Sequence, residues 1–193
     1  RSLGGAPAVD MAVAYTADPL YGPGGWDPGL CRACGVSVQQ LPAVALPGAP
    51  IGRVDGDGPL LTAGSVDVWC EQLVAGASLL GDVHVICGTT LIVWAVVDAS
   101  GPAAHPGLWT VPHSEPGRRL VGGASNAGGL FLEWATRMLR ADRRAPLDPA
   151  AVPVWSPYPR GERVPHHDPF RRAALHDLDL THGPAAVQRA ALE

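Results

Sequence analysis

The sequence has no long hydrophobic run and no excess of positive charge. Its longest unbroken apolar segment covers residues 91–97, which is too short to cross a bilayer. No apolar stretch of signal-peptide length follows the N-terminus. Asp and Glu (18) outnumber Lys and Arg (14), so the net charge is −4, whereas a nucleic-acid-binding surface needs a basic stripe. We therefore expect neither a membrane nor a nucleic acid among the partners of this protein.

Cysteine is scarce, with 4 residues in a chain of 193. A chain of this size does not depend on disulfides, and the expected compartment is the reducing cytoplasm. Cys31 and Cys34 form a CxxC pair, which can be a redox pair or half of a zinc site. No second CxxC or spaced His pair accompanies it, so two small half-buried side chains are the favoured interpretation. The histidines at 166–182 follow loop sequence rather than one helical face, which disfavours a metal site.

Glycine (24) and proline (20) are abundant and predict many tight connections between buried segments. Strand-like and helix-like segments alternate, which is typical of an α/β fold. In the clearest helical segment, Leu130, Trp134 and Met138 share one apolar face. The expected strands are 51–54, 60–64, 83–87, 91–97, one near 108, 118–123 and 152–157; the expected helices are 26–34, one capped by Ser65 and ending near 74, 126–139, and one from about 184.

Asp67 follows a short apolar strand in "LLTAGSVDVW". A carboxylate at a strand-to-helix junction lies at the edge of a sheet, where open α/β sheets bind their ligands. It can act as a general base that takes a proton from an attacking hydroxyl. It can equally be a helix N-terminal carboxylate that interacts with the helix dipole, and the local sequence favours this second interpretation.

Two glycine-containing segments follow Asp67 along the chain. Gly88, Thr89 and Thr90 offer backbone N–H groups and two hydroxyls at a tight turn, which is suited to a phosphate. The alternative is an ordinary hairpin turn. Residues 122–129 are rich in glycine and lead into a helix, where the backbone can approach an anion. A base, a hydroxyl-bearing turn and a glycine-rich helix start, in this order, fit phosphoryl transfer.

Several segments in their correct order resemble the FGGY carbohydrate kinases, a family that includes xylulokinase and glycerol kinase. They are "GGWDPGLCRACGVSVQQLPAVALPGAPIGRV", "TAGSVDVWCEQLVAGASLLGDVHVICGTT", "GGASNAGGLFLEW", "PYPRGERVPHHDP" and "VQRAALE". The resemblance implies that Asp67 is the catalytic base, which takes the proton of the sugar hydroxyl. It also implies that Gly88 and Thr89, with Thr90 beside them, contact the phosphates of ATP.

The resemblance extends to the nucleotide and to one loop. Gly129 matches a glycine that lies against the nucleotide, and Glu133 takes the position of a nucleotide-contacting Gln in some members. Gly161, Glu162 and Arg163 match a loop that we expect to be architectural, with its charged side chains paired to neighbours rather than to substrate.

The family has an actin-like (ribonuclease H-like) ATPase fold of two domains, and this chain resembles only a part of it. Residues 1–57 match the end of the first domain and residues 58–193 the first part of the second, on the nucleotide side. The resemblance implies a xylulokinase-like kinase that phosphorylates a pentulose or polyol, with ATP and Mg²⁺ as cofactors. Because the family's Asp-x-Gly-Thr loop is missing, we expect the isolated chain to be inactive. Besides the sugar, its expected partner is a second copy or a complementary domain.

The chain also departs from the family pattern. Ala173 and Asp177 replace glycines, Ala186 replaces a polar residue, and Val68 stands where Asn or Gln is frequent. These changes suit a degenerate, non-catalytic kinase that binds sugar or nucleotide for regulation. The retained Asp67 favours an enzyme, since a protein without activity has no need of a base.

Overall fold

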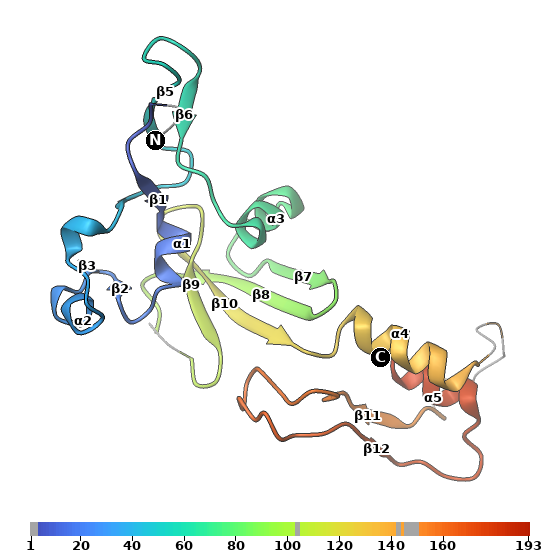
Figure 1. The fold of residues 1–193 in the computed structure, drawn as a ribbon. Coiled ribbons are helices and arrows are strands. Elements are labelled where there is room, and N and C mark those ends of the chain that lie inside the picture. Colours follow the sequence, from blue (N-terminus) through green and yellow to red (C-terminus); the bar gives the residue numbers. More distant parts are fainter. Residues whose placement is uncertain (1–3, 103–104, 142–143, 145–150) are drawn as a thin grey trace. The chain divides into compact units, whose positions relative to one another are not determined.

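The computed structural model describes residues 4–102, 105–141, 144 and 151–193 (Figure 1). The chain forms two compact units, of residues 1–82, 96–103 and 110–120 in the first and of residues 83–95, 104–109 and 121–193 in the second. Each unit is a set of segments whose residues contact one another more than they contact the rest of the chain. Units defined in this way do not test the predicted domain boundary between residues 57 and 58, which stays a prediction.

The first unit begins with small paired strands and short helices. Asp10 is buried and caps α1, because its Oδ1 accepts hydrogen bonds from the N–H groups of Ala12 (2.7 Å) and Val13 (3.2 Å). Strands β1 and β4 are parallel neighbours, and β5 pairs with β6 in an antiparallel hairpin. The elements are β1 (Ala8–Asp10), α1 (Met11–Tyr15), β2 (Tyr21–Gly22), β3 (Gly25–Trp26), α2 (Pro28–Ala33), the 3₁₀ helix Val38–Gln40, β4 (Ala43–Ala45), β5 (Pro50–Arg53), β6 (Leu60–Thr62) and α3 (Asp67–Ala75).

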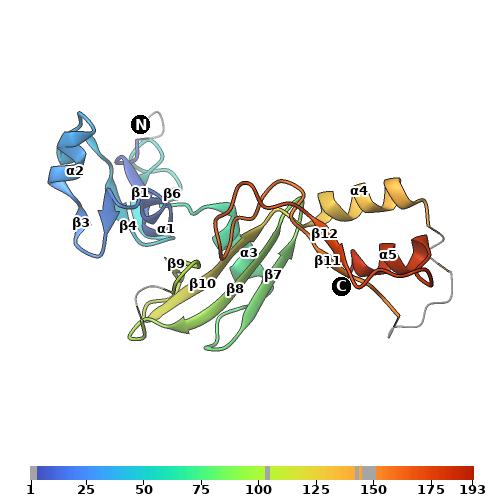
Figure 2. The same ribbon diagram turned by 90° about the horizontal axis from the view of Figure 1, so that it is seen from below.

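A four-stranded sheet in the order β7-β8-β10-β9 follows α3 (Figure 2). Its strands are β7 (Val83–Cys87), β8 (Leu91–Asp98), β9 (Trp109–Pro112) and β10 (Arg118–Ser125). Strands β7 and β8 pair in an antiparallel register from Val83 opposite Ala95 to Cys87 opposite Leu91, which confirms the predicted hairpin. Strand β7 is an edge strand.

The remainder of the second unit contains two helices and a small hairpin. Its elements are α4 (Gly129–Leu139), β11 (Val154–Ser156), β12 (Ala174–His176) and α5 (Pro184–Ala190). Helices α4 and α5 lie side by side, and the buried side chain of Gln188 donates a hydrogen bond to the hydroxyl of Thr136 (3.0 Å; Figure 1). The sequence predicted both helices but not β12. No helix in the described ranges is long and apolar enough to span a bilayer.

The predicted apolar face of α4 is not its buried face. Leu130, Trp134 and Met138 are 38%, 41% and 51% exposed, whereas Phe131 and Ala135 are almost fully buried. The ring of Phe131 packs edge-on against Trp155 of β11, at 5.5 Å between centroids. A shift of one position turns a helix by about 100°, so the neighbouring aromatic strand selects a different face from the one that the spacing predicts.

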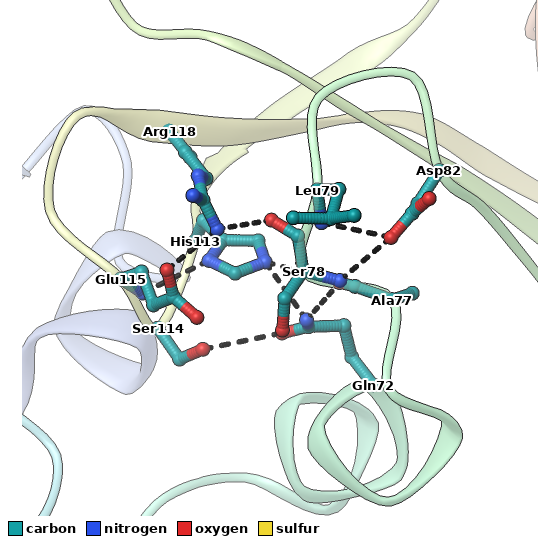
Figure 3. A network of polar contacts seen from close by, with 9 residues as sticks. All are labelled: Gln72, Ala77, Ser78, Leu79, Asp82, His113, Ser114, Glu115 and Arg118. Atoms are coloured by element: carbon teal, nitrogen blue, oxygen red, sulfur yellow. Dashed lines mark hydrogen bonds and ion pairs between the residues drawn. The ribbon is translucent and has the colours of Figure 1, made fainter.

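A buried polar network holds α3 in the first unit (Figure 3). Gln72 has no exposed surface, and its Nε2 donates to the carbonyl of Ala77 and lies 2.8 Å from Nε2 of His113. Its Oε1 accepts a hydrogen bond from the hydroxyl of Ser114 (3.3 Å). Nδ1 of His113 accepts a hydrogen bond from the N–H of Glu115 (2.9 Å), and its Nε2 lies 3.2 Å from the carbonyl oxygen of Ala77.

A second bond joins α3 to the same segment. The indole Nε1 of Trp69 donates to the carbonyl of Pro112 at 2.7 Å. Trp69 and Gln72 are both on the buried side of α3, so two side chains fix the helix that begins with Asp67.

Replacement of Gln72 by Leu should lower the free energy of unfolding by about 1–3 kcal/mol, because it removes the buried amide that donates to the Ala77 carbonyl and leaves the Ser114 hydroxyl and the buried Nε2 of His113 without the Gln72 contact. Urea denaturation followed by tryptophan fluorescence measures the loss. Gln39→Leu, at an exposed position, is the matched control and should change stability by no more than about 0.5 kcal/mol. Equal stabilities of the two variants would contradict the importance of the network.

Candidate functional site

The turn between β7 and β8 is exposed and holds unused hydrogen-bond donors. Gly88 donates its N–H to the carbonyl of Thr90 (3.0 Å), which closes the turn. Thr89 is exposed and Thr90 half-buried. Within the described residues, the N–H groups and hydroxyls of Thr89 and Thr90 have no hydrogen-bond partner. The turn therefore presents two backbone donors and two hydroxyls that the fold itself does not use.

The carbonyl groups of this turn cap helix α4. Gly129 donates its N–H to the carbonyl of Gly88 (2.7 Å), and Leu130 donates to the carbonyl of Thr89 (3.3 Å). In a trans peptide unit the C=O and the following N–H point in opposite directions. Because both carbonyls point at α4, the N–H groups of Thr89 and Thr90 point away from it. The cap thus orients the two free donors.

Glycine at position 88 has no structural explanation within the turn. Its φ is not in the left-handed region, and an added Cβ would meet nothing nearer than the Thr90 carbonyl oxygen at 3.9 Å. A side chain there would only cover the outer surface of the turn. Glycine at this position leaves room for a group that comes close to the backbone.

Gly128 and Gly129, in contrast, are required by packing. An added Cβ on Gly129 would lie 2.7 Å from the Gly88 carbonyl oxygen, and one on Gly128 would lie 2.2 Å from the carbonyl carbon of Thr90. The N–H groups that open α4 are used by the turn. The interpretation of this glycine-rich segment as a helix N-terminus open to an anion is therefore wrong in this conformation. Contact between Gly129 and a nucleotide stays a prediction.

Glu133 lies on α4 one turn after Gly129. Its carboxylate is exposed and lies 3.6 Å from Arg137, an exposed i,i+4 pair that adds little stability. The second unit thus brings Gly88, Thr89, Thr90 and Gly129 together through the cap, with Glu133 farther along the helix. The proposed nucleotide contact of Glu133 stays a prediction.

Asp67 is the first residue of α3 and is exposed. Its Oδ1 accepts a hydrogen bond from the N–H of Val68 (2.8 Å), and within the described residues it forms no ion pair. The helix cap is Val66 and not Ser65, whose hydroxyl instead donates to Oδ1 of Asp10 (3.4 Å). Asp67 belongs to the first unit, so its juxtaposition with the turn stays a prediction.

The loop at residues 159–163 is architectural, as predicted. Glu162 is 4% exposed, and its Oε2 lies 3.3 Å from the guanidinium of Arg171. Arg163 stacks over Trp109, 5.2 Å from the ring centroid. Gly161 has φ 79°, and an added Cβ would lie 2.7 Å from the Pro169 carbonyl.

Asn126 is a residue whose role the sequence did not reveal. Its Nδ2 donates to the carbonyls of Arg160 (3.1 Å) and Gly161 (3.3 Å), which joins the approach to α4 to this loop. The only local signal was an amide among glycines, because its partners lie more than 30 positions away in the sequence.

The cysteines carry no assigned chemistry. All four are free; Cys31 is buried, whereas Cys34 is exposed. Among residues 4–102, 105–141, 144 and 151–193, no group of three or more His, Cys, Asp or Glu side chains could hold a metal ion.

The chain is similar to xylulose kinases, although no family model matches it. It is 26% identical over 184 residues to the xylulose kinase of Escherichia coli (strain K12), covering 87% of this chain and 38% of that protein. It is 29% identical over 177 residues to the xylulose kinase of Klebsiella pneumoniae, covering 86% and 35%. The chain thus spans less than two fifths of the length of these relatives.

Solved structures of sugar kinases share its fold. A xyloylose kinase from Brucella ovis superimposes with a TM-score of 0.86 at 22% identity, over 99% of this chain and 42% of that one. A glycerol kinase from Plasmodium falciparum with ADP gives a TM-score of 0.76 at 16% identity, over 99% and 42%. These similarities show that the chain is folded like part of a sugar kinase, which confirms the α/β prediction at that level.

Replacement of Gly128 by Ala should lower the free energy of unfolding by about 1–3 kcal/mol, because the new Cβ meets backbone atoms that cannot move without opening the cap. Gly88→Ala, in the same turn, should change it by no more than about 0.5 kcal/mol. Urea denaturation measures both. Equal losses would show that Gly88 also serves the fold.

Proposed function

We propose that this chain is part of an ATP-dependent sugar kinase, xylulokinase-like, that transfers a phosphoryl group to a hydroxyl of a pentulose or polyol. The similarity to xylulose kinases over most of the chain supports the class of reaction. One observation supports the site: the capped turn at residues 88–90 directs two unused N–H groups away from α4 and carries two unused hydroxyls, beside a glycine that the fold does not need.

The turn suits a phosphate group in chemistry and in rigidity. Phosphate oxygens accept hydrogen bonds from backbone N–H groups and hydroxyls. Thr89 and Thr90 supply both kinds of donor, and Gly88 allows close approach. Since the turn is fixed by two hydrogen bonds to α4, these donors need little reorganisation on binding. When bound, ATP would supply the phosphoryl group, and Mg²⁺ would neutralise part of the negative charge of its phosphates. Gly129 and Glu133 are the proposed nucleotide contacts on α4.

Asp67 is the proposed general base. Its carboxylate is exposed, without an ion-pair partner among the described residues, and fixed at the start of α3. It can therefore accept the proton of the sugar hydroxyl. In this proposal residues 1–57 belong to the first domain of an actin-like ATPase fold and residues 58–193 to the second, in a cytoplasmic enzyme.

Binding of Mg²⁺–ATP tests the turn in the 193-residue chain itself. Titration followed by amide NMR should shift the resonances of residues 88–90. Thr89→Val keeps the shape of the side chain but removes the hydroxyl, so the affinity should fall about tenfold or more. Asp67→Asn is the matched control and should bind as wild type, because its proposed role is toward the sugar. Unchanged affinity in Thr89→Val would refute the phosphate role.

Catalysis tests the base. The isolated chain should form no sugar-dependent ADP with a panel of pentuloses, hexoses and polyols, because it lacks the Asp-x-Gly-Thr loop that clamps the phosphates in the kinases that it resembles. In an active kinase that contains these residues, Asp67→Asn should lower turnover about 10² to 10⁴-fold, with ATP affinity unchanged. Turnover near wild type would remove Asp67 from the mechanism.

A further inference from the structure

Asn126 lies between strand β10 and helix α4, and its side chain attaches this segment to a distant loop. Its Nδ2 donates hydrogen bonds to the carbonyls of Arg160 (3.1 Å) and Gly161 (3.3 Å). A side-chain amide has two N–H donors, so one side chain can serve both carbonyls. All three residues belong to the second unit. The path from β10 into α4 is therefore held at position 126 by a contact with the loop.

The loop that accepts these hydrogen bonds is itself fixed. Glu162, which follows Gly161, is buried, and its N–H donates to the carbonyl of Asp168 (2.8 Å). Val164 packs against β10 so closely that an added Cβ on Gly123 would lie 2.5 Å from its Cγ2. These contacts close the loop and hold it against the strand. Asn126 is thus attached to a support that other contacts keep in place.

The segment after Asn126 makes the contacts that orient the β7–β8 turn. Gly128 is buried, and an added Cβ would lie 2.2 Å from the carbonyl carbon of Thr90. Gly129 donates its N–H to the carbonyl of Gly88 (2.7 Å). Two successive glycines have no side chains that restrict their backbone, and glycine has the greatest conformational freedom of any residue. The cap therefore needs a fixed point just before it, which the amide of Asn126 provides.

We propose that Asn126 is a positioning residue for phosphate binding by the β7–β8 turn. It holds the start of α4 against the turn, and the resulting cap directs the N–H groups of Thr89 and Thr90 away from the helix. Asn126 acts through the cap and not by contact with ATP. This inference rests on the proposed phosphate role of the turn and extends the site to the loop at residues 159–163.

Asn126→Leu tests the proposal in the 193-residue chain, because leucine has nearly the shape of asparagine but no hydrogen-bond donor. The amides of Gly129 and Leu130, which form the cap, should exchange with solvent about tenfold faster or more. The affinity for Mg²⁺–ATP, measured by amide NMR titration, should fall about three- to tenfold, because the donors of the turn must then be ordered on binding. Asn126→Ala removes the donors without adding bulk and should show the same two changes.

Thr136→Val is the matched control. It removes a hydroxyl on α4 that accepts a hydrogen bond from the buried side chain of Gln188 (3.0 Å), about two helical turns after the cap. Urea denaturation should show that this variant loses at least as much stability as Asn126→Ala. Its affinity for Mg²⁺–ATP should nevertheless equal that of the wild type, since the cap is intact.

Three results would overturn the positioning role. They are wild-type affinity in Asn126→Ala, wild-type exchange at Gly129 and Leu130 in that variant, and an equal loss of affinity in Thr136→Val, which would make the effect one of stability. A wild-type chain that does not bind Mg²⁺–ATP would instead refute the phosphate role of the turn. The exchange rates of the cap amides would then decide alone whether Asn126 holds the cap.

Discussion

The hydrogen bond from Gly129 to the Gly88 carbonyl, at 2.7 Å, is the contact on which the proposed site depends. It joins a hairpin turn to the start of a helix, between residues 41 positions apart in the sequence. It requires glycine at 128 and 129, because any side chain would collide with the turn. It also decides the direction of two peptide units, since carbonyls turned toward α4 leave their N–H groups turned away. Helix capping and the proposed phosphate binding thus use opposite edges of the same peptide units.

Local signals in the sequence were sufficient where neighbours along the chain determine the structure. Two apolar runs around Gly88–Thr90 predicted the β7–β8 hairpin, and its register confirms it. The helix expected over residues 26–34 is observed as α2 (Pro28–Ala33), whose cap Asp27 acts within one helical turn. The architectural role of Glu162 and Arg163 also agrees with their observed partners. For the hairpin and for α2, the residues that determine the conformation lie within the segment itself.

Long-range contacts were the part that the sequence could not supply. The buried face of α4 is chosen by Trp155, and Ser65 is diverted from its expected cap by Asp10, 55 positions away. Spacing along a helix shows which residues share a face but not which face meets a neighbour. The same limit explains Gly128 and Gly129: a glycine-rich helix start looks alike whether its N–H groups are free or bound by a distant turn.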